Sequence, residues 1–308
     1  MPRAKLPWQS NFPPRTPASA WNAWFAVVVF HDGPFRWLMT QAFKPAERAP
    51  AGHPVASIEG FGDAPQSAWM AGFHGLQPPL HTASEHLIVA EAAGLDAGDT
   101  VWRWSDALEV EGTLLGRPTN LHATAVSAQA MQWLKISGLL DYRSFSADVT
   151  LRWGDEIWHG AGLLEHAWGG HLPVPASTIL PGSWQWDLLW DEGEPRHLHA
   201  ALTARWLGIG FSPKAFRDEG GRVRSVRTSP VDIDVDDNGI PTVWHGEIGG
   251  RAYRAERDGK PLIPFKGGAY FGFSYTMGDR RGVGLSRCLR HTPRPSPLPG
   301  QLFQPSLP

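Results

Sequence analysis

The sequence predicts an all-β protein made of two antiparallel halves, because of three observations. Apolar and polar residues alternate with a period of two, helical periodicity is scarce, and turn-forming pairs separate the alternating runs. In Ala269–Met277 the odd positions are apolar or aromatic and the even ones are mostly small or polar, which is typical of a half-buried strand. The other predicted strands are Trp24–Phe30, Phe35–Phe43, His86–Ala92, Val101–Val110, Asn120–Ala128, Ala147–Trp153, Ile157–Leu164, Trp184–Trp190, Leu198–Trp206, Val231–Val235 and Thr242–Ile248.

Hairpin tips are predicted where short polar pairs with glycine interrupt these runs. Such pairs allow the positive φ that a tight antiparallel connection requires. They therefore favour meanders of neighbouring strands. The pairs are Asp32-Gly33, Gly154-Asp155, Glu192-Gly193, Asn238-Gly239 and Asp258-Gly259.

The chain divides in two near its middle. With 308 residues and about a dozen predicted strands, it exceeds one simple sandwich. The segment His171–Gly182 contains three prolines and breaks the alternation, so we expect it to be the crossing between the halves. The predicted organisation is a proline-rich arm at residues 1–20, a first lipocalin-like domain at 21–178, a second at 179–290 and a proline-rich tail at 291–308.

Composition and charge exclude several classes of protein. Charged residues make up only 19% of the chain, the formal net charge is −2, and no basic block is present, so nucleic acid is not an expected partner. No glycine-rich phosphate loop follows a strand, which argues against a nucleotide-binding α/β fold. Cys288 is the only cysteine, so neither an intrachain disulfide nor a thiolate metal cage can form.

The expected location is cytoplasmic. The most apolar early stretch, Trp24–Phe30, is too short to be a transmembrane segment, and the residues before it are rich in proline rather than forming a signal-peptide core. The sequence gives no indication of the oligomeric state.

Tryptophan is unusually frequent. The chain has 16 Trp, 14 Phe and 4 Tyr residues. Large flat side chains bury much area at little cost in rotamer entropy, so they suit both a β core and the wall of an apolar cavity. Ordinary packing and the binding of a hydrophobic small molecule are both consistent with this composition.

The densest polar cluster in an apolar context is the segment Gly162–His171, which contains Glu165 and His166. Among aromatic side chains, a carboxyl group beside an imidazole can have its proton affinity shifted until it works as an acid or base near neutral pH. Neighbouring residues of a strand point to opposite faces, so only one of the two can enter a given cavity unless the backbone bulges. The pair could instead be structural and fix the crossing between the halves.

Around this segment the sequence resembles the carotenoid hydratase (hydroxyneurosporene synthase) and AttH group. Its Asp-His-x-Trp-Gly signature is matched by Glu165–Gly169, with Glu where Asp is usual, after the glycine-rich stretch His159–Gly162. Other matches follow in the expected order over roughly residues 21 to 205. They are Trp21–Phe25, where Trp24-Phe25 stands for a fuller Trp-Trp-Tyr cluster, then Asp32-Gly33, Phe35 and Gln41–Phe43, the tyrosine strand Asp141–Ser144, and the Trp-x-Trp strand from Trp184 to Gly193.

The resemblance implies two fused lipocalin-type barrels that hold a hydrophobic ligand. Members of the group hydrate isoprenoid double bonds, cyclise prenylated quinols or guide intramolecular cycloadditions, and others handle lipids without known catalysis. These reactions need no redox or nucleotide cofactor, because the enzyme supplies a proton, a fold for the polyene and aromatic faces that stabilise a carbocation.

We therefore expect a cofactor-independent, non-redox hydratase or cyclase, including the pericyclic (Diels–Alderase-like) form, that acts on a hydrophobic unsaturated isoprenoid or polyketide. The alternative is a noncatalytic protein that binds or transfers such lipids. In the catalytic reading, Glu165 or His166 is the acid or base and Tyr142 donates a hydrogen bond. The residues expected to contact the substrate are Trp24, Trp168, Trp186, Phe271 and Phe273.

A third reading is a metal-dependent β enzyme. His197 and His199 are two residues apart, which places both imidazoles on one face of a strand, as some zinc and iron sites require. Residues 200–204 are Ala, Ala, Leu, Thr and Ala, so a third ligand would have to come from elsewhere. Exposed or hydrogen-bonded histidines are the simpler interpretation, and we expect no metal.

Overall fold

The structure is a computed structural model of the chain. It describes residues 21–31, 36–44, 55–61, 67–69, 89–91, 94–96, 101–104, 107–114, 116–127, 129–136, 140–169, 183–206, 209–229, 232–259, 263–265 and 268–289. The predicted arm, crossing and tail, and the pair Asp32-Gly33, lie outside these residues, as does the predicted domain boundary after residue 178.

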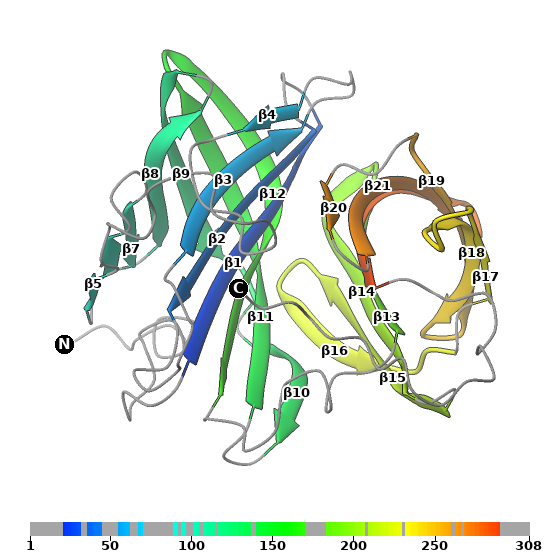
Figure 1. The fold of residues 1–308 in the computed structure, drawn as a ribbon. Coiled ribbons are helices and arrows are strands. Elements are labelled where there is room, and N and C mark those ends of the chain that lie inside the picture. Colours follow the sequence, from blue (N-terminus) through cyan, green and yellow to red (C-terminus); the bar gives the residue numbers. More distant parts are fainter. Residues whose placement is uncertain are drawn as a thin grey trace. The chain divides into compact units, whose positions relative to one another are not determined.

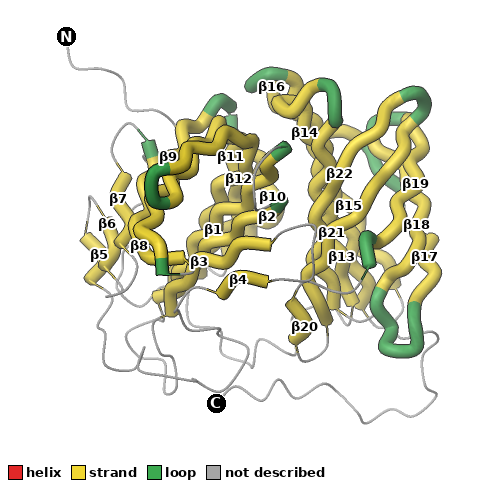
Figure 2. The backbone as a smooth tube through the Cα atoms, turned by 90° about the horizontal axis from the view of Figure 1, so that it is seen from above, coloured by secondary structure: helices red, strands yellow, loops and turns green. Residues whose placement is uncertain are grey.

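All regular elements in the described part are β-strands, and they form two antiparallel sheets (Figures 1 and 2). In each sheet the first strand pairs with the last, β1 with β12 and β13 with β22. Both sheets are strongly curled, as in lipocalin-type barrels (Figure 1). The predicted fold class, two lipocalin-like halves, is confirmed. The described residues include no helix that is long and apolar enough to cross a membrane.

The first sheet has the strand order β4-β3-β2-β1-β12-β11-β9-β8-β7-β6-β5, and β10 pairs with β11. Its central strands, β11 and β12, are also its longest, at 14 residues each. The strands are β1 (Trp21–Phe30), β2 (Trp37–Lys44), β3 (Val55–Phe61), β4 (Ser67–Trp69), β5 (Val89–Glu91), β6 (Gly94–Asp96), β7 (Val101–Trp104), β8 (Leu108–Leu114), β9 (Arg117–Ala125), β10 (Met131–Ile136), β11 (Leu140–Trp153) and β12 (Glu156–Gly169).

The second sheet has the order β16-β15-β14-β13-β22-β21-β19-β18-β17, and β20 pairs with β21. Its acidic strand β17 is an edge strand, where charge discourages further sheet extension. The strands are β13 (Ser183–Asp191), β14 (Glu194–Trp206), β15 (Ile209–Glu219), β16 (Arg222–Val226), β17 (Asp232–Val235), β18 (Pro241–Ile248), β19 (Arg251–Arg257), β20 (Ile263–Phe265), β21 (Gly268–Met277) and β22 (Arg280–Leu289).

The core of the first sheet lies on the face that carries the even-numbered residues of β1. Trp24, Ala26 and Val28 are all completely buried there, and the same cluster continues across β8, β9 and β11. The opposite face of the central strands is buried as well, since Val27 and Leu163 are at most 2% exposed. Burial on both faces explains why β1 is an almost uninterrupted apolar run.

The core of the second sheet is aromatic and is packed over glycine. Trp244, Phe271, Phe273 and Tyr275 belong to one buried cluster. Gly284 lies directly opposite Phe273 in the pairing of β21 with β22, and a Cβ atom added to it would be only 2.0 Å from the phenyl ring. The glycine therefore makes room for the ring, a known way of combining aromatic residues and glycine in neighbouring strands.

Turns account for one correction to the sequence analysis. Turns occur at Gly154-Asp155, Glu192-Gly193 and Asn238-Gly239, as predicted. The predicted strand Val101–Val110 is two strands, because the chain reverses between Trp104 and Leu108 and these residues pair with each other. The sequence between them contains Ser105-Asp106, two consecutive polar residues of the turn-forming type in a run that otherwise alternates.

Candidate functional site

The predicted catalytic residues lie on the two central strands of the first sheet. Glu165 pairs with Ser144 of β11, and His166 pairs with Arg143, in a register that runs through β12 without a shift. Directly opposed residues share a face, and successive residues alternate between faces. Glu165 and His166 are therefore on opposite faces of the sheet, and β12 has no bulge that would bring them together.

Glu165 is the acceptor of a buried hydrogen-bond network. The hydroxyl of Tyr142 donates to its Oε1 at 2.7 Å, and the hydroxyl of Ser144 donates to the same oxygen at 3.0 Å. Ser144 in turn accepts a hydrogen bond from the indole Nε1 of Trp133 at 2.6 Å. Glu165 is 3% exposed, whereas Tyr142 is half-buried, so the phenol connects a buried carboxyl group to a more accessible position.

His166 lies in an aromatic stack on the other face. Its ring is parallel to that of Trp24, with centroids 5.2 Å apart and an interplanar angle of 8°, and it is tilted against Trp168 at 4.5 Å. The guanidinium of Arg143 lies 5.2 Å from the Trp168 ring and is held by a salt bridge to Asp141. Trp24 and His166 are completely buried, so this stack belongs to the packed inner face of the first sheet.

The two faces offer different chemistry. Two hydroxyl groups donate to one oxygen of Glu165, so they are placed to stabilise negative charge that develops on the carboxyl group as it gives up a proton. On the opposite face the imidazole is covered by indole rings, an arrangement suited to packing and to π-stacking. Tyr142 and Glu165 are therefore the predicted catalytic residues that the structure brings together, and His166 is separated from them.

The predicted substrate-contacting residues of the second sheet are divided between its faces. Phe271 and Phe273 are completely buried and make edge contacts with Trp244, at centroid distances of 5.6 and 4.8 Å. Trp186 lies on the other face, since it pairs with Arg287 whereas Phe271 pairs with Ser286. The two phenylalanines are thus part of the core described above, and their contact with a substrate remains a prediction.

The second sheet contains a buried carboxyl group, Asp187, that was not predicted from the sequence. Trp244 Nε1 donates to its Oδ2 at 3.0 Å, Tyr253 donates to the same oxygen at 3.3 Å, and Gln185 Nε2 is 2.9 Å from Oδ1. Burial raises the pKa of Asp187 to about 6, although hydrogen bonds from Ser286 and these donors act to lower it. The available signal was a carboxylate flanked in sequence by the large apolar residues Trp186 and Leu188.

A second carboxylate on the same face of β13, Asp191, lies beside the histidine pair. Tyr275 donates to its Oδ1 and Arg280 to its Oδ2, each at 2.5 Å. His199 Nε2 and His197 Nδ1 are each 3.7 Å from an Asp191 oxygen. Burial acts to raise the pKa of Asp191, but His199, Tyr275 and Arg280 outweigh it and hold the pKa well below its usual range.

The carboxylate of Asp191 thus lies near the histidine pair, but it already accepts hydrogen bonds from other residues. Both oxygens of Asp191 accept hydrogen bonds, Oδ1 from Tyr275 and Oδ2 from the guanidinium of Arg280. In the part of the chain that the structure describes, no group of three or more His, Cys, Asp or Glu residues is arranged to hold a metal ion.

Comparison with known proteins identifies the fold. No protein-family model matches the chain, and no curated protein matches its sequence. Among solved structures, an AttH candidate from Nitrosomonas europaea superposes with a TM-score of 0.61 at 12% identity, covering 94% of this chain and 97% of that one. CghA gives a TM-score of 0.53 at 11% identity over 93% of each chain. Kievitone hydratase from Nectria haematococca gives 0.44 at 11% identity over 94% of each chain.

The likeness is one of fold. At these identities the solved structures support two lipocalin-like halves in one chain, which agrees with the AttH resemblance in the sequence. The role of each residue has to be argued from this chain's own geometry. The Tyr142–Glu165 contact joins the tyrosine strand of the AttH-like pattern to its Glu-His signature.

Proposed function

We propose that the chain is a cofactor-independent, non-redox enzyme that protonates a hydrophobic unsaturated small molecule, an isoprenoid or a polyketide, and so hydrates or cyclises it. The observation that carries the proposal is the buried carboxyl group of Glu165 with two hydroxyl donors on one oxygen, beside the half-buried phenol of Tyr142. Glu165 is the acid, and Tyr142 positions it and faces the substrate.

The first step is transfer of the Glu165 proton to carbon. The proton is carried on Oε2, because Oε1 accepts the hydrogen bonds of Tyr142 and Ser144. As the proton leaves, the negative charge that develops on the carboxylate is stabilised by these donors. The π electrons of the substrate double bond form the new C–H bond, and the neighbouring carbon becomes a carbocation.

The second requirement is stabilisation of that carbocation. The rings of Tyr142 and Trp133 are 6.4 Å apart and inclined by 33°, next to the acid. Aromatic faces attract a cation through the ring quadrupole, most strongly where water is excluded. Tyr142 thus serves both as hydrogen-bond donor and as an aromatic surface for the cation.

The same cation leads to either product. In hydration, a water oxygen bonds to the cationic carbon and its surplus proton returns to the Glu165 carboxylate. In cyclisation, a second double bond of the same molecule supplies the electron pair for a C–C bond, and the carboxylate takes the proton lost from the resulting cation. Both routes regenerate the acid and neither changes the oxidation level overall.

A deuterium experiment tests the proposal without requiring the product to be known in advance. Compounds that copurify with the chain are extracted and identified by mass spectrometry, then incubated with the chain in D₂O together with farnesol, geranylgeraniol and retinol as probes. We expect carbon-bound deuterium in the product of the unchanged chain. Glu165→Gln should abolish it, and Tyr142→Phe should slow it by about 10²-fold. Glu109→Gln in β8, where the side chain is 41% exposed and lies beside His122, is the matched control.

Two results would contradict the proposal that the chain is an enzyme with Glu165 as its acid. Incorporation that is the same in Glu165→Gln as in Glu109→Gln would remove Glu165 from the chemistry. Tight binding of a copurified compound or a probe, with no deuterium incorporated by the unchanged chain, would instead identify a noncatalytic lipid-binding or transfer protein.

A further inference from the structure

One end of the second sheet carries charged side chains at positions that face its core. In β19, Arg251 shares a face with Tyr253 and Ala255, both of which are in the aromatic core. In β21 and β22, Met277 and Arg280 pair with each other at the end of the hairpin. The last inward positions of these strands are therefore occupied by Arg251, Met277 and Arg280. The inward positions nearer the centre of the strands, in contrast, carry aromatic or small residues.

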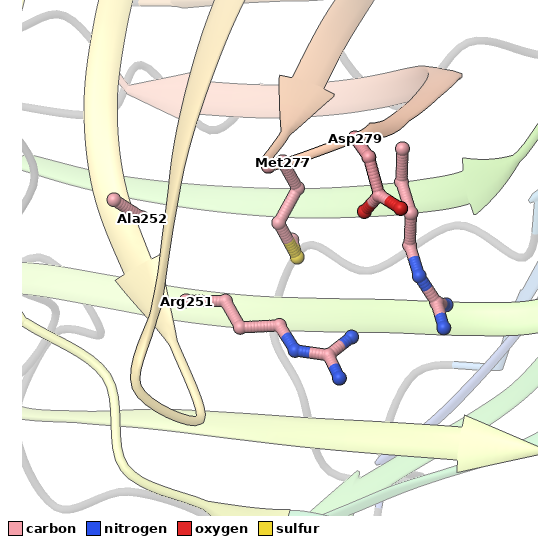
Figure 3. Close-up of a pocket in the computed structure, with 6 residues that line it drawn as sticks. Arg251, Ala252, Met277 and Asp279 are labelled. Atoms are coloured by element: carbon pink, nitrogen blue, oxygen red, sulfur yellow. The ribbon is translucent and has the colours of Figure 1, made fainter.

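These residues surround a pocket of about 560 Å³. It is lined by Arg251, Ala252, Met277, Gly278, Asp279 and Arg280. Figure 3 shows Met277 and Asp279 reaching into it from one side and Arg251 from the other. The volume is within the range of small-molecule sites, and Met277, which is 1% exposed, gives it an apolar floor.

The two guanidinium groups differ in what already binds them. Arg280 donates to Asp191 through Nη1, and this hydrogen bond, with smaller contributions from the carboxylates of Glu219 and Asp279, raises its pKa. Arg251 is exposed, and among the described residues none forms an ion pair with it. The pocket thus combines one available guanidinium fork, one guanidinium whose charge is compensated, and an apolar floor.

We propose that this pocket is a second binding site, for an organic monocarboxylate with a short apolar chain. The carboxylate is bound by Arg251, whose planar fork matches its two oxygens, and the chain lies on Met277. Asp279 at the same pocket repels a second negative charge, which favours a monoanion over a dicarboxylate or a phosphate. The lining residues all belong to the second sheet and its turns, and the site does not depend on the function proposed for Glu165.

Methionine-methyl NMR of the full chain tests the site directly. The chain has five methionines, so the ¹³C-methyl signal of Met277 can be assigned from a Met277→Leu spectrum. The probes are octanoate, the neutral 1-octanol and the dianion suberate. We expect octanoate to shift the Met277 signal saturably, and octanol and suberate to bind at least about tenfold more weakly.

A matched pair of variants tests the role of Arg251. Arg251→Gln should weaken octanoate about tenfold, whereas Arg254→Gln should leave it unchanged, because Arg254 is exposed on the other face of the same strand and pairs with Glu256. The proposal would be overturned if the two variants bound octanoate with equal affinity, or if octanoate and octanol bound equally well. It would also be overturned if octanoate shifted no methionine signal, or only that of Met131 in the first sheet.

Discussion

The buried carboxyl group of Asp187 should make the unfolding free energy of the protein fall as the pH rises. The substitution Asp187→Asn should remove this dependence. Burial raises the pKa of Asp187 to about 6 in the folded chain, from the value of 3.8 that an aspartate has in an unfolded chain. Between these values the folded state binds more protons than the unfolded state. The stability that the neutral acid provides is therefore complete below pH 3.8 and is lost as the pH rises through 6.

The size of the effect follows from the two pKa values. A difference of about 2 pH units, at about 1.4 kcal/mol per unit, gives roughly 3 kcal/mol of unfolding free energy lost between pH 4 and pH 7. Asp187→Asn cannot ionise, so it does not suffer this loss. The amide fits the Trp244 and Tyr253 donors less well than a carboxylate does, but that cost is the same at every pH.

Urea unfolding of both proteins at a series of pH values provides the measurement. The quantity to compare is the difference in unfolding free energy between Asp187→Asn and the unchanged chain, which should move by about 3 kcal/mol in favour of the variant from pH 4 to pH 7. Contributions of other groups, including Asp191, cancel in this difference. Asp232→Asn, an exposed carboxylate of the same unit, should show a flat difference. A flat difference for Asp187→Asn as well would refute the argument that the carboxyl group is desolvated.

Two further predictions concern packing in the second sheet. Gly284→Ala places a methyl group inside the contact distance of the Phe273 ring, so it should lower the unfolding free energy in a urea titration by about 3 kcal/mol. Gly193 has open space around it, so Gly193→Ala should lower the unfolding free energy by less than about 1 kcal/mol. Equal losses of stability in the two variants would contradict the packing argument. Burial raises the pKa of the Cys288 thiol to about 12. At pH 8 the thiol of the folded chain should therefore react with iodoacetamide at least about 10²-fold more slowly than the thiol of the urea-unfolded chain. Similar rates would show that the thiol is accessible in the folded chain.

The fold was predictable from the sequence because alternation and turn chemistry are local signals. The turn at Gly154-Asp155 joins β11 to β12 as expected, and the residues on either side of it pair directly. The same local signal failed at β22, where the inward positions include Gly282 and Gly284. Their partners, Tyr275 and Phe273, fill the space that a side chain would occupy, so the apolar face of β22 is supplied by its neighbour.

The candidate site was predictable only in part. Glu165, His166 and Tyr142 were candidates from the sequence and stay predictions, whereas the expectation that Glu165 and His166 point to opposite faces is confirmed by the register of β12. The contact between Tyr142 and Glu165 depends on the register of β11 against β12. The turn at Gly154-Asp155 sets this register only if neither strand contains a bulge, and the contact also depends on side-chain rotamers that no local pattern specifies. Asp187 was missed for a similar reason, since its donors Trp244 and Tyr253 come from strands that are distant in sequence.

The uninterrupted register of β12 has a consequence for how this chain can evolve. Removal of one residue between Ile157 and Leu164 would exchange the two faces beyond that point, bringing the imidazole toward Tyr142 and the carboxyl group among the tryptophans. Only an insertion or deletion of an even number of residues in this stretch therefore keeps both the packing of His166 and the contact between Tyr142 and Glu165. Related chains should accordingly show an even number of residues gained or lost between the β11–β12 turn and the Glu-His pair.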